Sequence, residues 1–208
     1  MKNLPLMLIL ALNIIVFIGW NYINSETQLT FMVDNFLVSW VSVFEGRPWT
    51  LLTSVFSHAS TFHLLFNMMA LMSFSSVMLT ILGPLSFTTF YLIAGLAGSV
   101  AHIVSSAYLI HDPAMKALGA SGAVSGIILL FSLLFPQQRL LIMGIIPVRA
   151  IWGAVGLMGL DVWGLVNQTK GGGFAIGHGA HLGGAVIGII YYFFVKRRFK
   201  ARASALGL

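Results

Sequence analysis

The sequence predicts an all-α membrane protein, a bundle of six transmembrane helices with a membrane-associated first loop. Only 8% of its 208 residues are charged and 58% are apolar, whereas a soluble domain carries about a quarter charged residues. The apolar residues gather in six segments, and a helix that crosses a bilayer needs about 20 such residues. We therefore interpret residues 1–208 as a single membrane domain.

The six predicted helices differ in length. In chain order they cover approximately residues 4–22, 59–82, 85–110, 120–135, 150–166 and 177–195. We expect the first to be retained rather than cleaved as a signal peptide, because no small-residue cleavage pattern follows it. The fourth is short for a span, which fits a helix that begins below the outer membrane surface. Irregular backbone is tolerated at that depth where protein or water surrounds it.

The first loop, residues 23–57, is too apolar for an ordinary solvated loop. Large apolar and aromatic side chains stand among few charges, namely Phe31, Phe36, Leu37, Trp40, Val41, Phe44 and Trp49. This composition predicts short helices lying in the outer membrane interface. A folded loop packed on the bundle would explain the same residues.

The basic residues predict the orientation in the membrane. Six spans put both termini on one side, together with Lys2, Arg139, Arg149 and the tail cluster Lys196, Arg197, Arg198, Lys200 and Arg202. The opposite side holds Arg47, Lys116 and Lys170. Basic residues are enriched in cytoplasmic loops, so we expect both termini in the cytoplasm. The tail cluster directly follows an apolar segment, which indicates an anchor to the lipid bilayer rather than a nucleic-acid site.

Polar side chains inside the predicted spans are costly and usually face the interior of a bundle. The ones that bear on chemistry are His63, Asn67, His102, Ser121, Ser125, Asp161, His178 and His181, with His58 just before the second segment. His63 and Asn67 are four residues apart and share a helix face. By itself, that pair fits a hydrogen bond between helices equally well.

Ser121 begins the fourth segment within the stretch LGASGAVSG. Gly119 permits a sharp turn into the helix, and Gly122 permits close approach of another backbone. The free N–H groups and the dipole of a helix N-terminus favour an anion, such as the oxyanion of acyl transfer. A simple N-cap above a packing face is the alternative role for this serine.

His181 is the candidate base. It shares a helix face with Gly184 and Gly188, just as Ser121 shares one with Gly122 and Gly126. Helices with glycine on facing sides approach closely, which would bring the Ser121 hydroxyl within hydrogen-bond reach of His181, as activation of a serine requires. A histidine that only bridges two helices is the alternative.

Three stretches together resemble the rhomboid intramembrane serine proteases: LTSVFSHASTFHLLFNMMAL, LGASGAVSG and GHGAHLGGAVIG. They occur in the family's order and on its expected helices. The resemblance implies a six-helix bundle that cleaves transmembrane segments of other proteins with a serine–histidine dyad and without metal or cofactor. It assigns Ser121 as the nucleophile and His181 as the base and acid.

The same resemblance assigns supporting roles. His63 and Asn67 would form the side-chain half of the oxyanion hole, and the Ser121 N–H would complete it. Phe66 matches an apolar position where substrates approach, and His58 matches a supporting histidine upstream.

The sequence departs from the family pattern near the catalytic histidine and in the first loop. Ser125 stands where many bacterial members have a tyrosine that stacks on the histidine. His178 and Asp161 are candidates to support it instead, although no third member of a triad is evident. In the first loop, Trp49 is followed by Thr50 rather than arginine.

Two further stretches, SFSSVMLTILGP and GHGAHLGG, are similar to the mitochondrial branch of the family. That branch has an extra helix before the core and a transit sequence, and neither is seen in this sequence. We therefore expect a bacterial-type protein in the plasma (inner) membrane.

Three other functions fit parts of the sequence. A metalloprotease could use His63, His178, His181 and Asp161, but the sequence has no H-E-x-x-H motif and no glutamate in a predicted span. A transporter would suit buried histidine and aspartate, yet no matching halves are visible. A catalytically inactive rhomboid relative that binds membrane proteins is disfavoured because both dyad positions are filled.

Overall fold

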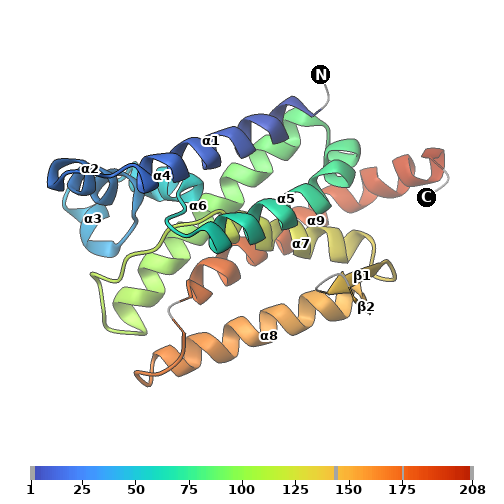
Figure 1. The fold of residues 1–208 in the computed structure, drawn as a ribbon. Coiled ribbons are helices and arrows are strands. Elements are labelled where there is room, and N and C mark those ends of the chain that lie inside the picture. The colour runs from blue at the N-terminus through green and yellow to red at the C-terminus, as the bar shows by residue number, and fades with distance from the viewer. Residues whose placement is uncertain (1–2, 143–144, 175, 207–208) are drawn as a thin grey trace.

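The chain folds into a helical bundle with one small hairpin (Figure 1). The structure is a computed structural model that describes residues 3–142, 145–174 and 176–206. Its main helices are α1 (Leu4–Asn21), α5 (Thr61–Leu82), α6 (Pro84–Tyr108), α7 (Ser121–Leu134), α8 (Ala150–Gln168) and α9 (His178–Leu206). Each coincides with one of the six predicted segments, so the predicted all-α bundle is confirmed.

Five of the main helices are long and apolar enough to cross a membrane, with α9 counted over His178–Lys196. The remaining one, α7, is apolar but has only 14 residues. The number of six spans therefore remains a prediction that depends on α7. Helix α9 continues to Leu206, well past the predicted end near residue 195. Lys2 and the side chains of Arg197, Arg198, Lys200 and Arg202 lie outside the described residues.

The first loop contains short helices, as predicted: α2 (Glu26–Phe36), α3 (Trp40–Phe44), α4 (Thr50–Thr53) and the 3₁₀-helix η1 (Ser54–Phe56). Serine side chains begin two of them. Ser25 accepts a hydrogen bond from the Gln28 N–H, and Ser39 forms a capping box with Ser42. Val38 pairs antiparallel with Ala117, which ties this loop to the segment that precedes α7.

A two-stranded antiparallel hairpin, β1 (Arg139–Ile142) and β2 (Ile146–Arg149), joins α7 to α8. No element was predicted for these residues. The strands are four residues each, and such short pairs depend on their backbone hydrogen bonds more than on a recognisable apolar pattern.

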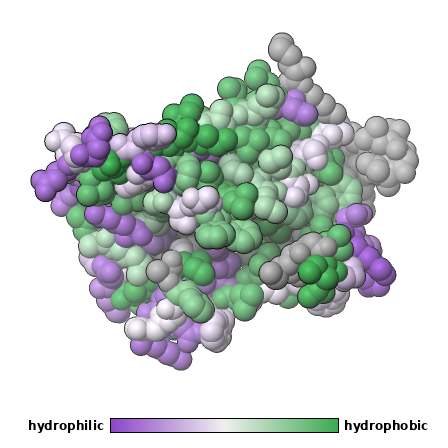
Figure 2. Space-filling view, viewed as in Figure 1, coloured by the Kyte–Doolittle hydropathy of each residue, from purple (hydrophilic) through white to green (hydrophobic). Residues whose placement is uncertain are grey.

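The two ends of the bundle differ in composition from its middle. Figure 1 places the start of α1, the end of α9 and the β1–β2 hairpin at one end, and the first loop and the α8–α9 connection at the other. Figure 2 shows a band of apolar side chains across the middle, with hydrophilic groups gathered toward the two ends. This is the distribution expected when lipid surrounds the middle and water reaches the ends.

Helix α9 packs against both α6 and α7, and glycines make this close packing possible. A Cβ on Gly184 would lie 1.8 Å from the carbonyl oxygen of Gly122, and one on Gly188 would lie 2.6 Å from that of Gly126. On its other face, a Cβ on Gly183 would lie 2.4 Å from the Cβ of Ala101 of α6. The backbones of α7 and α9 are therefore in direct contact, as the glycine spacing predicted.

Candidate active site

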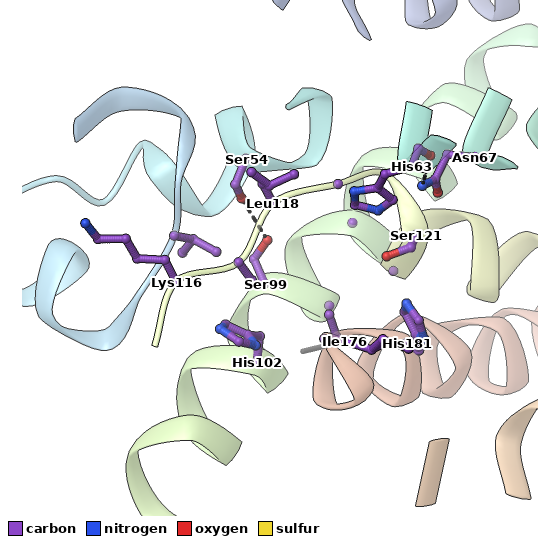
Figure 3. A pocket seen from close by; sticks show the side chains of 18 of the residues that line it. Ser54, His63, Asn67, Ser99, His102, Lys116, Leu118, Ser121, Ile176 and His181 are labelled. Atoms are coloured by element: carbon purple, nitrogen blue, oxygen red, sulfur yellow. Dashed lines mark hydrogen bonds between the residues drawn. The ribbon is translucent and has the colours of Figure 1, made fainter. Parts of the chain in front are cut away.

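A cavity of about 790 Å³ lies where the first loop, α5, α6, α7 and α9 meet. Figure 3 shows its polar side chains, which come from segments far apart in the sequence. Polar groups among its lining residues are Ser54, His63, Asn67, Ser99, His102, Lys116, Ser121, Gln168 and His181. A polar cavity within an apolar bundle is the place where a membrane protein holds water or a polar ligand.

Ser121 is the first residue of α7. Gly119, just before it, has φ of 123°, a conformation that glycine adopts without strain. The turn is held from the first loop, because the Gly119 N–H donates to the Ser54 carbonyl at 2.9 Å. Among the described residues, no backbone group accepts from the N–H groups of Ser121, Gly122 or Ala123. Free donors at a helix start favour a negatively charged ligand.

His58 stabilises the same turn through a hydrogen bond. Its side chain is completely buried, and Nε2 accepts a hydrogen bond from the Ala120 N–H at 3.5 Å. Burial, together with the nearby His63, lowers the pKa of His58 to about 3. The ring is therefore neutral at ordinary pH and keeps the lone pair that this role requires.

His63 and Asn67 lie on α5, beside the turn (Figure 3). The His63 ring rests on Gly119, where an added Cβ would come within 2.6 Å of Cε1. Asn67 is buried, and its Nδ2 donates to the His63 carbonyl at 2.9 Å, which leaves a second amide hydrogen available. One turn of α5 thus brings two side-chain donors to the wall of the cavity that holds Ser121.

Gly119→Ala is expected to distort the turn before Ser121 for two reasons: alanine is strained at a positive φ, and the added Cβ collides with the His63 ring. We expect destabilisation of about 1–3 kcal/mol and a loss of Ser121 reactivity of at least about tenfold, since small misplacements of reacting groups are costly. Thermal unfolding measures the loss of stability, and the rate at which a serine-directed fluorophosphonate labels Ser121 measures the loss of reactivity. Gly83→Ala is the matched control: its φ is 83° and nothing lies within 4 Å of the added Cβ. Equal effects of the two substitutions would contradict the role of the His63 contact.

His181 lies one turn into α9 and lines the same cavity as Ser121. In Figure 3 the His181 ring points toward Ser121 across the cavity. No hydrogen bond joins the two side chains in the described part of the chain, so the predicted hydrogen bond is not formed there. Hydrogen bonds between catalytic groups are often long until substrate binds.

An aspartate lies beside Nδ1 of the His181 ring. Nδ1 of His181 lies 2.8 Å from Oδ1 of Asp161, a residue of α8. Nδ1 of His178 lies 2.8 Å from the same oxygen. Asp161 and His178, the two candidates to support His181, are thus brought together with it, because α8 and α9 pack side by side.

Of the remaining predicted residues, Phe66 borders the cavity and Ser125 does not. Phe66 is 67% exposed on α5 and borders the cavity. Ser125 is one turn after Ser121 but does not line the cavity, so the position where many relatives carry tyrosine contributes nothing to it. Gly122 packs against the backbone of Ala180.

Two residues with structural roles at the cavity were missed or left without a role. Gln168, at the end of α8, donates from Nε2 to the carbonyls of Phe174 and Ile176, both at 2.8 Å. His102 of α6 makes a hydrogen bond from Nε2 to the Met115 carbonyl at 3.1 Å. Each ties down a connecting segment over the cavity. A polar residue near the end of an apolar segment was the available signal for both.

Asp161, His178 and His181 also form a group that could hold a metal ion, since one ligand atom from each lies within 4.8 Å of the others. The two nitrogen–oxygen distances of 2.8 Å are those of charge-assisted hydrogen bonds. Hydrogen bonding thus accounts for this geometry.

These features define a multi-pass membrane protein with a serine and a histidine in one polar cavity. The Rhomboid domain matches residues 45–198, which is most of the chain, and the protein therefore belongs to the rhomboid family. Members of this family are generally intramembrane serine proteases that act on membrane proteins.

The chain is similar to several curated proteins. It is 34% identical over 212 residues to RHOMBOID-like protein 12, mitochondrial, of Arabidopsis thaliana, covering 96% of this chain and 60% of that protein. It is 31% identical over 149 residues to Rhomboid protein 1, mitochondrial, of Saccharomyces cerevisiae, covering 71% and 42%. It is 33% identical over 184 residues to the human Presenilin-associated rhomboid-like protein, mitochondrial, covering 88% and 46%.

The chain spans about half the length of these relatives. Their names place them in mitochondria, in agreement with the similarity to the mitochondrial branch noted in the sequence. They conflict with the expectation of a bacterial plasma membrane.

Proposed function

We propose that this protein is an intramembrane serine endopeptidase that cleaves transmembrane segments of other membrane proteins with Ser121 and His181. The observation that carries the proposal is the shared cavity: Ser121 begins α7 among unpaired N–H groups, and the His181 ring points toward it. A nucleophile, a base and free donors are the groups that acyl transfer requires.

In the first step, Oγ of Ser121 attacks the carbonyl carbon of the substrate peptide and His181 takes the hydroxyl proton on Nε2. The tetrahedral intermediate then collapses, the carbon–nitrogen bond breaks, and His181 gives the proton to the leaving amine. Water next attacks the acyl-enzyme, with His181 again as the base. The carboxyl product leaves, and Ser121 regains its proton.

The oxyanion of each intermediate needs donors in a place closed to lipid. The Ser121 N–H and the side chains of His63 and Asn67 supply them. Support comes from the unpaired N–H at the start of α7 and from the position of both side chains on the cavity wall. The polar lining of the cavity also favours the water that deacylation consumes.

Substrate would reach the cavity from the lipid between α5 and α8. These helices both pack on α7 but not extensively on each other. Large apolar side chains of α5, including Phe62, Phe66 and Met69, are exposed on the bundle surface. A substrate helix has to unwind locally before cleavage, because a fully hydrogen-bonded helix shields its carbonyl carbons. We therefore expect cleavage near small or helix-breaking residues.

The charge distribution supports a cytoplasmic location of both termini. Arg139 and Arg149 of the hairpin lie at the end of the bundle that holds the start of α1 and the end of α9. The last part of α9 adds five basic residues to the same end, Lys196, Arg197, Arg198, Lys200 and Arg202. Arg47, Lys116 and Lys170 belong to connections at the other end. An excess of basic residues marks the cytoplasmic side of a membrane protein.

Covalent labelling tests the proposal without knowledge of a substrate. A serine-directed fluorophosphonate is expected to label the purified full chain once. Ser121→Ala should abolish labelling, and His181→Ala should lower its rate by about a hundredfold or more, in the range of general-base catalysis. Ser132→Ala serves as the control, since the hydroxyl of this buried serine of the same helix has no hydrogen-bond partner among the residues that the structure describes. Labelling that persists in Ser121→Ala, or none in the unmodified chain, would refute the assignment of the nucleophile.

A further inference from the structure

Asp161 is an acidic side chain in the middle of an apolar helix. It lies on α8, within a candidate membrane span, and its side chain is only 10% exposed. A buried carboxylate is unfavourable unless hydrogen-bond donors or opposite charges compensate it. The hydrogen-bond partners of Asp161 therefore indicate its role.

Both partners of Asp161 are histidines of α9, and both use the same ring nitrogen. Nδ1 of His178 and Nδ1 of His181 each lie 2.8 Å from Oδ1. A carboxylate can only accept, so each Nδ1 must carry a hydrogen. In a neutral imidazole, a hydrogen on Nδ1 leaves Nε2 as the acceptor.

This arrangement decides which nitrogen of His181 can act as a base. Asp161 holds the Nδ1–H, and the ring lines the cavity on the side of Ser121 (Figure 3). Nε2 is then free to take the proton from Oγ. When it does so, the imidazolium that forms keeps a hydrogen bond to a negative charge.

His178 has the same bond but no access to the cavity. It is buried, and its Nε2 has no hydrogen-bond partner in the described part of the chain. Its ring rests on Gly164 of α8, where an added Cβ would come within 2.2 Å of Nε2. His178 therefore acts as a fixed second donor that holds the Asp161 carboxylate in place.

We propose that Asp161 is a positioning residue for His181, so that the protein works with a Ser121–His181–Asp161 arrangement rather than a dyad, and that His178 fixes the carboxylate. The inference rests on the proposed function. It also explains how the imidazole is held although Ser125 replaces the stacking tyrosine.

The test measures fluorophosphonate labelling of the full chain in detergent over a series of probe concentrations. Asp161→Asn is expected to lower the maximal labelling rate at least about tenfold, with little change in the half-saturating probe concentration. Asp161→Glu, which keeps the charge, should recover part of the rate. Asp34→Asn is the matched control, because Asp34 lies on α2 in an ion pair with Arg47 and should leave the rate within about twofold of the unmodified chain.

The other outcomes are separable. A wild-type rate in Asp161→Asn overturns the positioning role and leaves Ser121 and His181 standing. Loss of folding in both Asp161 variants, measured by thermal unfolding, would show a structural role only and also overturns it. A change of the wild-type rate on addition of EDTA would mean that an ion bridges the three side chains, which contradicts the hydrogen-bonded arrangement. Absence of Ser121-dependent labelling in the unmodified chain instead refutes the proposed function.

Discussion

Replacing Ser121 by alanine is expected to abolish cleavage of a transmembrane substrate while leaving the fold intact. The side chain removed is one hydroxyl at the cavity wall, and it has no hydrogen-bond partner among the described residues, so its loss removes the nucleophile without breaking a structural contact. Enzymes that lose the nucleophile of a serine–histidine pair retain only the residual acceleration from binding and the oxyanion donors.

The measurement is cleavage of a reporter with one transmembrane segment, reconstituted with the full chain in lipid vesicles. A segment that contains glycine or proline near its outer end is compared with one of leucine only, which stays helical. We expect products from the first alone, and none with Ser121→Ala. Ser132→Ala, the same change farther along α7, should keep the wild-type rate. Cleavage by purified Ser121→Ala at the wild-type rate would exclude the proposed mechanism.

Gly184→Ala is expected to cause the largest loss of stability of any glycine-to-alanine substitution between α7 and α9. The new Cβ would lie 1.8 Å from the Gly122 carbonyl oxygen, so α7 and α9 would have to move apart. Overpacking typically costs about 1–3 kcal/mol, and we expect the upper end, because the atom met is rigid backbone. A loss of this size lowers the melting temperature by about 5–10 °C in a chain of this length.

The same substitution should reduce activity more than stability alone explains. His181 lies on α9 one turn before Gly184, and Ser121 precedes Gly122 on α7, so separating the helices also separates the nucleophile from the base. A misplacement of about 1 Å can cost about a hundredfold in rate. Thermal unfolding and fluorophosphonate labelling at a temperature well below unfolding measure the two effects on one sample.

Gly153→Ala is the matched control for this experiment. Gly153 also lies within a membrane-spanning helix, α8, but nothing lies within 4 Å of an added Cβ. Alanine favours helix over glycine by about 1 kcal/mol, so Gly153→Ala should leave stability unchanged or raise it slightly. If Gly184→Ala were equally harmless, the direct backbone contact of α7 and α9 would be contradicted.

Two kinds of contact hold the cavity together, and they differ in how visible they are in a sequence. The glycines at 122, 126, 184 and 188 recur at helical spacing, so the close approach of α7 and α9 could be anticipated from their pattern. Gln168 and His102 are visible as polar residues in apolar segments, but the backbone carbonyls that they bind are not, because these acceptors lie in irregular connections. Side chains that fix the loops over a cavity are therefore identified only from the three-dimensional structure.

The sequence by itself determined the class of the protein and most of its helices. Scarcity of charge and the length of the apolar segments led to a membrane bundle, since lipid admits helices whose backbone bonds are satisfied internally. Local rules also placed Ser121 at the start of a helix after a glycine turn, because helix boundaries depend on neighbouring residues. The end of α9 was missed, since a helix can continue into polar sequence beyond the bilayer.

Only the tertiary structure decided what surrounds His181. Asp161 and His181 belong to different helices, and no local pattern dictates the course of the connection between them. A rotation of either helix about its axis by the angle of one residue would separate the two side chains. The absence of a Ser121–His181 hydrogen bond and the presence of an Asp161–His181 one depend on how α7, α8 and α9 pack together. The sequence named Asp161 and His178 only as candidates to support the base, because packing is a property of all three helices at once.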